Sequence, residues 1–529
     1  MTTKFIFVTG GVVSSLGKGI MASSVGQLLK KQGFKVTMQK FDPYINVNPG
    51  LLSPSQHGEV FVTDDGSETD LDLGHYERFL DENLNQESSV TTGQIYARVI
   101  EKEKSNVYKG ATIQVIPHIT DEIKQKLISV AKSTKADIVI TEIGGTVGDI
   151  ESLPFLEAIR QARKDFGYKN TLYIHTTLVP FLKAAKEIKT KPTQHSVKEL
   201  MSLGIAPDML VLRSEMPFDK GIKEKISSFC DVKKEMIFES VDVEIIYQMI
   251  LNLKQQKIDT QILKHFRLYP KQQQDLSEWK ELINKIESLQ KTVKIAVIGR
   301  HISFHDAYLS VNEALKHAGY QQNRNVEIKW LDSTKINAEN VGIRLKDVQG
   351  VLIPGGFGQS GIEGKLQSIK FARENNIPFL GICLGMQLAL VEFAKNVINI
   401  KKATSKEFHP YAKNPIIDYL KDGKTEKKTG LHKIKIKPKT LAIKLYQTTN
   451  ISERFRHNYE FNLAYEKEFL NKGLVFSGYN QNGGVEIMEN PENDFFVGVQ
   501  YHPEYLSRPL RPHPLFIGFI KAVKKFQNS

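Results

Sequence analysis

A glycine-rich loop near the start of the chain restricts its fold more than any other feature. The loop runs from Gly10 to Gly19, follows the apolar residues 5–8 and leads into a stretch with helical spacing. A short apolar run bounded by glycine predicts a buried strand. Strand, glycine-rich loop and helix form the anion-binding unit of mononucleotide folds, in which backbone N–H groups and the helix N-terminus hold phosphate. We therefore predict an α/β fold with a parallel sheet and a phosphate site that includes Lys18.

The loop is not a standard Walker A sequence. Five residues separate Gly11 from Gly17, and Gly19 stands where that motif has a Ser or Thr that binds Mg²⁺. For the loop alone, a glycine-rich turn without a ligand is the alternative. Other residues in the first half of the chain help to decide whether this loop binds phosphate.

Charged side chains stand at the ends of later predicted strands. Two of these strands end on Lys40 and Glu142, and Asp70 and Asp72 face the same way if their segment is extended. Open α/β sheets bind ligands at the carboxyl ends of their strands. A carboxylate there is suited to Mg²⁺ bridged to nucleotide phosphates. Taken singly, an aspartate in such a place more often caps a turn or a helix.

Residues 189–194 form a second candidate phosphate site. They offer two lysines, hydroxyls and an amide on a loop stiffened by proline. A solvated lysine loop is the alternative. Together with the glycine-rich loop, they provide more phosphate-binding groups than one nucleotide needs. We therefore predict that two triphosphates bind side by side.

In the second half, Cys383 lies where a predicted strand turns into a predicted helix. Residues 377–380 are apolar, residues 388–394 have helical spacing, and Gly381 and Gly385 flank the cysteine. Glycine allows the tight bend that presents a nucleophile, and a helix start favours thiolate character. A lone cysteine is more often a small buried hydrophobe. The catalytic reading therefore needs further support.

Two other motifs give this support. Backbone N–H groups of residues 355–356 and of Leu384 are suited to form an oxyanion hole. His502 follows a predicted strand, and Glu504 comes two residues later, so the imidazole can act as base toward the thiol while the carboxylate orients it. This combination indicates a class I glutamine amidotransferase, which forms a glutamyl thioester and releases ammonia.

Chain length, cysteine content and net charge limit the possible domain organisation, binding sites and partners. At 529 residues the chain exceeds one core, and we predict a first domain over residues 1–265, a linker over 266–292 and a second domain over 293–529. Two cysteines, Cys230 and Cys383, exclude a disulfide framework and a multi-cysteine zinc site. The net charge of +13 is spread along the chain, which favours nucleotide phosphates over nucleic acid. No transmembrane run or signal peptide is seen, so we expect a cytoplasmic protein without a membrane partner.

Several longer runs resemble the CTP synthase family. They are residues 10–19, 56–60, 69–78, 114–118, 142–151 and 189–194, and the likeness continues through the second half. The resemblance implies a P-loop-type parallel-sheet amidoligase domain followed by an α/β class I glutamine amidotransferase domain. The implied activity is that of an ATP-dependent C–N ligase. ATP phosphorylates O4 of the uracil ring of UTP, and ammonia from L-glutamine displaces the phosphate to give CTP.

The resemblance also implies the ligand residues of the first domain. Lys18 and Lys40 are the implied catalytic cations on the transferring phosphoryl group, and Asp72 and Glu142 bind Mg²⁺. The ATP residues are Ser15, Leu16, Gly17, Lys18, Gly19, Ile20, Asp72 and Arg213. UTP, and CTP as a competing product inhibitor, take Ser14, Asp149, Ile150, Glu151, Lys189, Thr190, Lys191, Pro192, Thr193, Gln194 and Lys225.

In the second domain the resemblance implies a catalytic triad of Cys383, His502 and Glu504. Glutamine is held by Gly356, Leu384, Gly385, Met386, Gln387 and Glu407. An ammonia passage between the two sites is formed by Pro54, His57 and Val60. The family also implies a homotetramer and GTP as an allosteric activator.

The chain departs from the family at three places that bear on control. The arginine used with GTP is replaced in the run 359–361, where Ser360 stands. The lid arginine is replaced around residues 430–434, and the arginine that meets the glutamine carboxylate appears as Asn458. Arg456, two residues earlier, is a candidate substitute. We expect weak dependence on GTP.

Two alternatives to a CTP synthase remain open from the sequence. One is a nucleotide-binding regulatory or structural homologue with impaired glutamine turnover, which the three departures suggest and the intact triad opposes. The other is a glutamine-dependent amidoligase with a different acceptor. Against a GMP-synthetase-like enzyme, the chain has no Ser-Gly-Gly-x-Asp-Ser pyrophosphatase loop.

Overall fold

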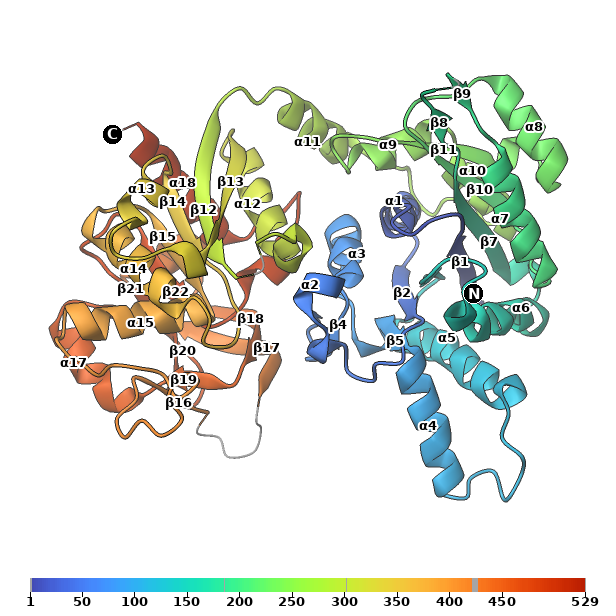
Figure 1. Cartoon of the computed structure of the whole chain (residues 1–529). Helices are drawn as coiled ribbons and strands as arrows, with labels where there is room; N and C mark the ends of the chain where they lie inside the picture. The colour runs from blue at the N-terminus through green and yellow to red at the C-terminus, as the bar shows by residue number, and fades with distance from the viewer. Residues whose placement is uncertain (1, 185, 301, 421–426, 529) are drawn as a thin grey trace. The chain divides into compact units, whose positions relative to one another are not determined.

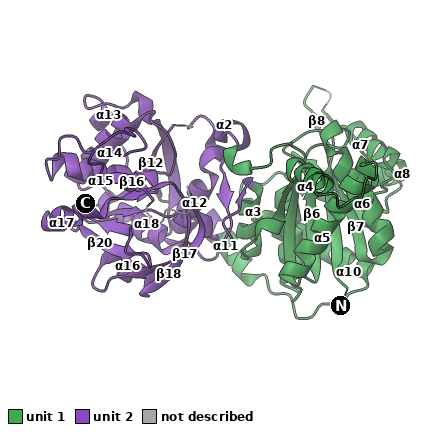
Figure 2. Ribbon diagram, turned by 90° about the horizontal axis from the view of Figure 1, so that it is seen from below, with its two compact units in different colours: residues 1–51, 72–283 green, residues 52–71, 284–529 purple. Residues whose placement is uncertain are grey.

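The computed structural model of the chain describes residues 2–184, 186–300, 302–420 and 427–528 (Figure 1). These form two compact units, coloured separately in Figure 2. The first comprises Met1–Leu51 and Asp72–Ile283, and the second comprises Leu52–Leu71 and Asn284–Ser529. Both units are α/β structures, as the sequence predicts.

The first unit is built on a parallel sheet. In the described residues this sheet has seven strands, in the spatial order β11 (Ile237–Val241), β10 (Met209–Ser214), β7 (Thr171–Leu178), β1 (Lys4–Gly10), β6 (Ile138–Ile143), β2 (Val36–Asp42) and β5 (Ser89–Thr91). Every neighbouring pair is parallel. All strands therefore end at the same edge of the sheet, where ligands of such folds bind.

Helices cover both faces of this sheet. They are α1 (Lys18–Lys30), α3 (Asp72–Leu80), α4 (Thr92–Lys104), α5 (Thr120–Thr134), α6 (Leu153–Phe166), α7 (Lys191–Ser202), α8 (Lys220–Cys230), α9 (Gln248–Gln255), α10 (Ile258–Phe266) and α11 (Ser277–Glu287). Phe5 and Phe7 of β1 share a core with α4, α5 and α6. Ile140 of β6 lies instead against α1, within 3.4 Å of a Cβ built on Gly26. Because both faces are buried, the strands read as continuous apolar runs.

The structure confirms the predicted start of the chain, since β1 leads through the glycine-rich loop into α1. The strands predicted to end near Lys40 and Glu142 are also present as β2 and β6. The extended arrangement considered for Asp70 and Asp72 is wrong. Strand β4 (Glu68–Thr69) stops before them, and Asp72 begins α3. A carboxylate in the first turn of a helix is favoured by the helix dipole, which explains this placement.

The second unit has a mixed sheet. Among the described residues it has nine strands, in the order β13 (Asn325–Asp332), β12 (Thr292–Gly299), β14 (Gly350–Ile353), β15 (Phe379–Ile382), β22 (Phe496–Val499), β21 (Val485–Glu489), β20 (Val475–Tyr479), β17 (Lys428–Ile436) and β18 (Asn450–His457). The pairs from β13 to β22 are parallel, and those from β22 to β18 are antiparallel. The predicted strands before Cys383 and His502 are β15 and β22.

The helices from residue 309 onward in this unit are α12 (Leu309–Gln321), α13 (Val341–Leu345), α14 (Ile362–Glu374), α15 (Leu384–Asn396), α16 (Leu441–Tyr446), α17 (Glu466–Asn471) and α18 (Pro514–Gln527). One core cluster joins the sheet to α14 and α15, and another joins it to α12 and α18. A small sheet pairs β16 (Ile417–Tyr419) with β19 (Tyr459–Phe461). No helix in the described parts of the chain is long and apolar enough to cross a membrane.

Residues 52–71 come from the first half of the sequence but belong to the second unit. They contain α2 (Pro54–His57) and the hairpin of β3 (Phe61–Val62) with β4. The Asp64 carboxylate accepts a hydrogen bond from Nε of Arg454 at 2.7 Å, and Glu68 accepts one from Nε of Arg456 at 2.5 Å. The Arg454 side chain is 0% exposed. Because a buried guanidinium requires a counter-charge, this segment is part of the charge balance of the second unit.

The core of the first unit gives a direct test. Ile140 is 0% exposed, so Ile140→Ala removes buried methyl groups and leaves a cavity. We expect a loss of about 2–5 kcal/mol in the free energy of unfolding of this unit. Trp279 lies in the first unit and Trp330 in the second. Denaturant unfolding followed by fluorescence in a Trp330→Phe background therefore reports on the first unit.

The matched control is Ile45→Ala, because Ile45 lies in the same unit and is 75% exposed. This change should alter the free energy of unfolding by about 0.5 kcal/mol or less. Equal losses in the two variants would contradict the core position of Ile140.

Candidate active sites

The glycine-rich loop holds non-glycine residues in left-handed backbone conformations. The φ angle is 82° at Val12 and 57° at Ser15, and a positive φ is especially unfavourable for a β-branched side chain. Gly17, with φ 77°, is the N-cap residue of α1, and no side chain caps it. The first turn of α1 thus offers its backbone N–H groups beside Lys18, which is the arrangement that binds phosphate.

A buried polar layer beneath the loop was missed by the sequence analysis. Thr9 Oγ1 lies 2.9 Å from His175 Nδ1, and His175 Nε2 lies 2.8 Å from Ser196 Oγ. Burial, with the charge of Lys18, lowers the pKa of His175 to about 3, so the ring is neutral. A Cβ on Gly11 would come within 1.7 Å of Ser196 Oγ, so only glycine fits there. The available signal was a histidine that directly follows the apolar residues 172–174.

Lys40 is the centre of a buried charge cluster where β2 and β6 end. Its Nζ donates to Asp72 Oδ2 at 2.5 Å and to Glu142 Oε1 at 3.1 Å. The Tyr76 hydroxyl donates to the other oxygen of Glu142 at 2.5 Å. Burial opposes the charge on Lys40, but the carboxylates of Asp72 and Glu142 outweigh it and raise the pKa of Lys40 well above its usual value. One predicted catalytic lysine thus contacts both predicted metal ligands.

Two carboxylates are a small donor set for a metal ion. Within the described ranges, no group of three or more His, Cys, Asp or Glu side chains is arranged to hold one. Mg²⁺ is commonly held by one or two carboxylates together with substrate phosphates and water. Asp72 and Glu142 therefore fit Mg²⁺ in the presence of a nucleotide. A Cβ on Gly19 would lie 3.1 Å from Glu142 Oε2, so the missing side chain keeps these carboxylates next to the start of α1.

The other residues predicted to bind ATP lie in the loop or at the same sheet edge. Lys18 Nζ donates to the Gly145 carbonyl at 2.5 Å, and burial lowers the pKa of Lys18. Arg213, near the end of β10, donates through Nη1 to the Ser15 carbonyl at 2.5 Å and through Nε to Asp242 at 2.9 Å. The remaining members are Leu16, Gly17, Gly19 and Ile20, in the loop and the first turn of α1.

The residues predicted to bind UTP include a buried group at the start of α7. Thr193 Oγ1 lies 3.0 Å from Thr177 Oγ1, and Gln194 Nε2 donates to Thr190 Oγ1 at 3.1 Å. These contacts hold the 189–194 segment in shape.

The exposed or partly exposed members of this set are Ser14, Asp149, Ile150, Glu151, Lys189, Lys191, Pro192 and Lys225. A hydrogen bond from Lys189 and the weaker influence of the Lys225 charge lower the pKa of Glu187. The structure thus brings Lys189 and Lys225 to the same carboxylate.

Cys383 lies between β15 and α15 in a strained conformation, with φ 50° and ψ −103°. The turn depends on the two flanking glycines. A Cβ on Gly381 would come within 2.7 Å of the Gly385 carbonyl carbon, and a Cβ on Gly385 within 2.2 Å of the Ile353 carbonyl oxygen. The sequence prediction of a tight strand-to-helix turn is confirmed. Strain of this kind at a nucleophile is characteristic of a nucleophile elbow.

His502 and Glu504 form a buried pair, with Nδ1 and Oε1 2.7 Å apart. A Cβ on Gly355 would lie 2.6 Å from His502 Cε1 and 3.5 Å from Cys383 Cβ, so this glycine touches both groups. Burial lowers the pKa of His502, but the charges of Glu504 and Cys383 outweigh it and raise that pKa to about 10. His502 Nε2 is buried without a hydrogen-bond partner among the described residues.

Residues predicted to bind glutamine surround Cys383. Leu384, Gly385, Met386 and Gln387 form the first turn of α15, and Gln387 Nε2 donates to the Tyr459 carbonyl at 3.0 Å. Glu407 Oε1 accepts from the Gly358 N–H at 2.8 Å and so holds the loop that contains Gly356.

Lys365 is a buried cation near this loop that the sequence analysis did not identify. Burial lowers its pKa to about 8 against the charge of Glu407. Nothing in the sequence indicated that this lysine is buried, because a lysine at a helical position is ordinary.

Two departures from the family pattern have clear structural settings. Asn458 Oδ1 is buried without a hydrogen-bond partner in the described parts of the chain. Arg456, the candidate substitute, donates to Glu68, and its guanidinium lies 5.1 Å from the ring centre of Phe357. Residues 430–434, taken for the lid, are part of strand β17.

The residues predicted to form an ammonia passage are in the segment 52–71 of the second unit. Pro54 and His57 are the ends of α2, and Val60 follows it. The carbonyl of Val60 accepts a hydrogen bond from the Tyr505 hydroxyl at 2.8 Å. Tyr505 also stacks on His502, with ring centres 5.1 Å apart.

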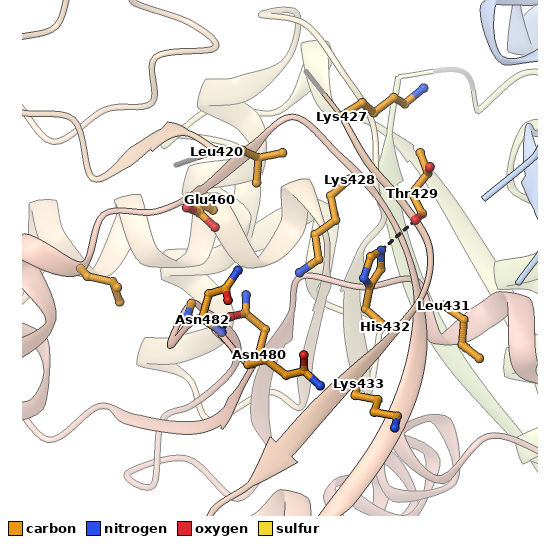
Figure 3. A pocket seen from close by; sticks show the side chains of 13 residues that line it. Leu420, Lys427, Lys428, Thr429, Leu431, His432, Lys433, Glu460, Asn480 and Asn482 are labelled. Atoms are coloured by element: carbon orange, nitrogen blue, oxygen red, sulfur yellow. Dashed lines mark hydrogen bonds between the residues drawn. The ribbon is translucent and has the colours of Figure 1, made fainter. Parts of the chain in front are cut away.

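A separate cavity of about 730 Å³ lies beside β17 (Figure 3). Lys428 and Asn480 from its wall both donate to Glu486 Oε1, at 2.6 and 2.7 Å. Its lining residues are Leu420, Lys427, Lys428, Thr429, Leu431, His432, Lys433, Glu460, Leu463, Asn480, Gln481, Asn482 and Gly484. None of the predicted site residues lines it.

Comparisons with known proteins cover the whole chain. Residues 4–268 match the family described as CTP synthase N-terminus, and residues 303–522 match glutamine amidotransferase class-I. A CTP synthase of Staphylococcus haemolyticus is 55% identical over 534 residues, covering 100% of both chains. A CTP synthase of Onion yellows phytoplasma is 57% identical over 529 residues, covering 99% of this chain and 98% of that one. The glutaminase domain of Trypanosoma brucei CTPS with bound acivicin is 31% identical and has a TM-score of 0.43, covering 44% of this chain and 94% of that one.

The raised pKa of His502 gives a test of the buried pair. Because the folded protein favours the protonated ring, its stabilising effect is complete below pH about 6.5 and is lost as the pH rises toward about 10. Between these values the wild-type protein should lose thermal stability relative to His502→Gln. Unfolding midpoints of both proteins across this range provide the measurement. Parallel pH profiles would contradict a charged His502.

Glu504→Gln is the companion variant. It keeps the size of the side chain but removes the charge that raises the pKa of His502. The loss of stability with rising pH should therefore still begin near pH 6.5, but it should be smaller and end at a lower pH than in the wild type.

Proposed function

The chain belongs to the CTP synthase family, and on this premise we propose which of its residues carry out the reaction. The reaction is the ATP-dependent amination of UTP to CTP with ammonia from glutamine, so the protein is a glutamine-hydrolysing ligase. We assign glutamine hydrolysis to the second unit and amination to the first. The observation that carries the assignment is that Cys383 and His502 both border the place of a Cβ on Gly355, beside the 2.7 Å pair of His502 and Glu504.

Glutamine hydrolysis is assigned to the second unit. Cys383 Sγ attacks the carboxamide carbon, and the N–H groups of Gly356 and Leu384 receive the developing oxyanion. His502 exchanges a proton with the thiol and passes one to the departing ammonia, while Glu504 holds the imidazole. Water then cleaves the thioester to release glutamate. The unpartnered Nε2 of His502 supports this role, because a proton-transferring nitrogen must be open to the reacting groups.

Amination is assigned to the first unit. The loop and Lys18 bind ATP phosphates, and Lys40 stabilises negative charge on the transferring phosphoryl group. Transfer to O4 of UTP converts a poor leaving group into phosphate, which ammonia then displaces. Asp72 and Glu142 would hold Mg²⁺, which neutralises phosphate charge when it is bound. Lys40 donates hydrogen bonds to both of these carboxylates. It would therefore lie beside the phosphate charges that shift during the transfer.

We assign UTP, with CTP as a competing inhibitor, to Ser14, to residues 149–151 and 189–194, and to Lys225. Lys189 pairs with Glu187 at 2.7 Å, and the charge of Lys225 also acts on that carboxylate, so two cations in one region support a shared anion site. Large apolar side chains are exposed on this unit at Ile116, Ile150 and Phe229, which are 51%, 79% and 63% exposed. Such exposure supports an assembly of several copies, and we propose the homotetramer implied by the family. The cytoplasmic location stays a prediction.

We propose that GTP has little effect on this enzyme. Ser360 stands in the run where the family has an arginine, and Asn458 replaces another arginine near the glutamine site. Asn458 carries no charge and its only side-chain donor is the Nδ2 amide, so it cannot reproduce the charged two-point contact of an arginine with a carboxylate. A regulatory homologue without turnover is less favoured, because the chain is similar over its full length to CTP synthases and retains the triad.

The assignment of Cys383 is tested by changing the nitrogen source. Cys383→Ala should abolish glutamine-dependent CTP formation and leave ammonium-dependent formation near the wild-type rate, because ammonia bypasses the thiol. Cys230→Ala is the matched control, since Cys230 lies in α8 of the first unit and takes no part in the proposed chemistry. It should retain both activities. Continued glutamine use by Cys383→Ala would refute the assignment.

The GTP proposal is tested by titration. The rate of glutamine-dependent CTP formation should change little as GTP is added at fixed ATP, UTP and glutamine. Ammonium-dependent formation in the same solutions serves as the control for competition at the nucleotide sites. Strong, saturable activation by GTP would show that other residues replace the missing arginines.

A further inference from the structure

The Tyr505 side chain contacts both the proposed general base and the segment 52–71. Its ring stacks on the imidazole of His502, with ring centres 5.1 Å apart and planes inclined by 13°. Its hydroxyl donates to the Val60 carbonyl at 2.8 Å. The first contact fixes the plane of a catalytic ring, and the second fixes a peptide group of the proposed ammonia passage.

The Tyr505 ring has little freedom to take another orientation. The side chain is 5% exposed, and Phe61 packs edge-on against it with ring centres 5.1 Å apart. The Tyr505 carbonyl accepts from Arg508 Nη1 at 2.8 Å, which holds the turn after His502. Burial, together with the charge of Glu504, raises the pKa of the Tyr505 phenol, so its hydroxyl remains a donor.

The peptide of Val60 is held from its other side by the preceding residue. The Glu59 carboxylate accepts from the backbone N–H of Ser310 at 2.8 Å, and the Glu59 N–H donates to the Asp306 carbonyl at 2.9 Å. Both contacts lie at the start of α12. The contacts of Glu59 therefore hold the Val60 peptide on one side, and the Tyr505 hydroxyl holds it on the other. Removing the hydroxyl releases only the second of these contacts.

We propose that Tyr505 is a positioning residue that couples the orientation of His502 to the position of Val60, so that ammonia is released in line with the passage. The proposal rests on the assignment of Pro54, His57 and Val60 as that passage. A second tyrosine in the same motif provides a contrast. The Tyr501 hydroxyl is buried and lies 2.8 Å from that of Tyr446, and Tyr446 in turn donates to Glu453.

Tyr505→Phe tests the hydroxyl alone, because the stacked ring remains. We measure glutamate released, CTP formed from glutamine and CTP formed from ammonium by the full-length enzyme. CTP formed per glutamate released should fall by about twofold to tenfold, the scale of one lost hydrogen bond. Glutamate release and ammonium-dependent synthesis should stay near wild-type values.

Tyr501→Phe is the matched control. It removes a buried hydroxyl of the same kind, four residues earlier, from a different hydrogen-bond partner. CTP formed per glutamate released should equal the wild-type value. A fall as large as that in Tyr505→Phe would overturn the proposal, because the loss would then follow from any buried hydroxyl in the motif.

Tyr505→Leu tests the ring. Without the stack, the imidazole of His502 is less well aligned, so kcat for glutamine hydrolysis should fall by about tenfold or more with KM little changed. The pH profile of hydrolysis should also shift, because His502 loses its neighbour. An unchanged pH profile and kcat would overturn the positioning role, as would an equal fall in ammonium-dependent synthesis, which indicates general damage to the fold.

Measurements on the wild-type enzyme distinguish a failure of the Tyr505 proposal from a failure of the passage assignment on which it rests. If wild-type CTP formed per glutamate is already far below one while ammonium-dependent synthesis is normal, the passage assignment fails and the coupling role fails with it. If the wild type is well coupled and Tyr505→Phe matches it, the passage stands and the role of Tyr505 is refuted.

Discussion

The common edge at which parallel strands end is the constraint on which both active regions depend. The interiors of these strands are buried on both faces, so polar groups are confined to the strand ends and the turns that follow. In the first unit this rule brings Lys40 and Glu142 together from neighbouring strands. In the second it places Cys383 and His502 after the adjacent strands β15 and β22. The same backbone arrangement thus supports both of the chemistries that we propose for these groups.

Buried charges in this protein are stable because they have opposite charges in contact. Lys40 keeps its proton because Asp72 and Glu142 outweigh the effect of burial. His502 does so because of Glu504 and Cys383. Lys365, with weaker compensation from Glu407, has a lowered pKa instead. The balance between desolvation and neighbouring charge therefore decides which buried cation is a permanent charge.

The segment 52–71 shows how a short stretch of sequence can belong to a distant part of the chain. Its acidic residues Asp64 and Glu68 meet Arg454 and Arg456, which lie in β18 of the second unit. Arg456 is also close to Phe357, which directly follows the predicted oxyanion residues 355–356. The contacts of this segment thus extend to the surroundings of Cys383. Such ion pairs are specific because an arginine buried without them is costly.

The sequence by itself determined the class of fold and the main strands and turns, and it led to the reactive groups that we propose. Apolar runs and glycines at Gly381 and Gly385 are local signals, because strand burial and tight turns depend on residues close in sequence. Only the tertiary structure decided that Asp72 starts a helix, that His175 supports the glycine-rich loop, and that Tyr505 meets Val60. The last two depend on contacts between residues far apart in the chain. No local pattern records such contacts, since they exist only when the sheets and helices have packed.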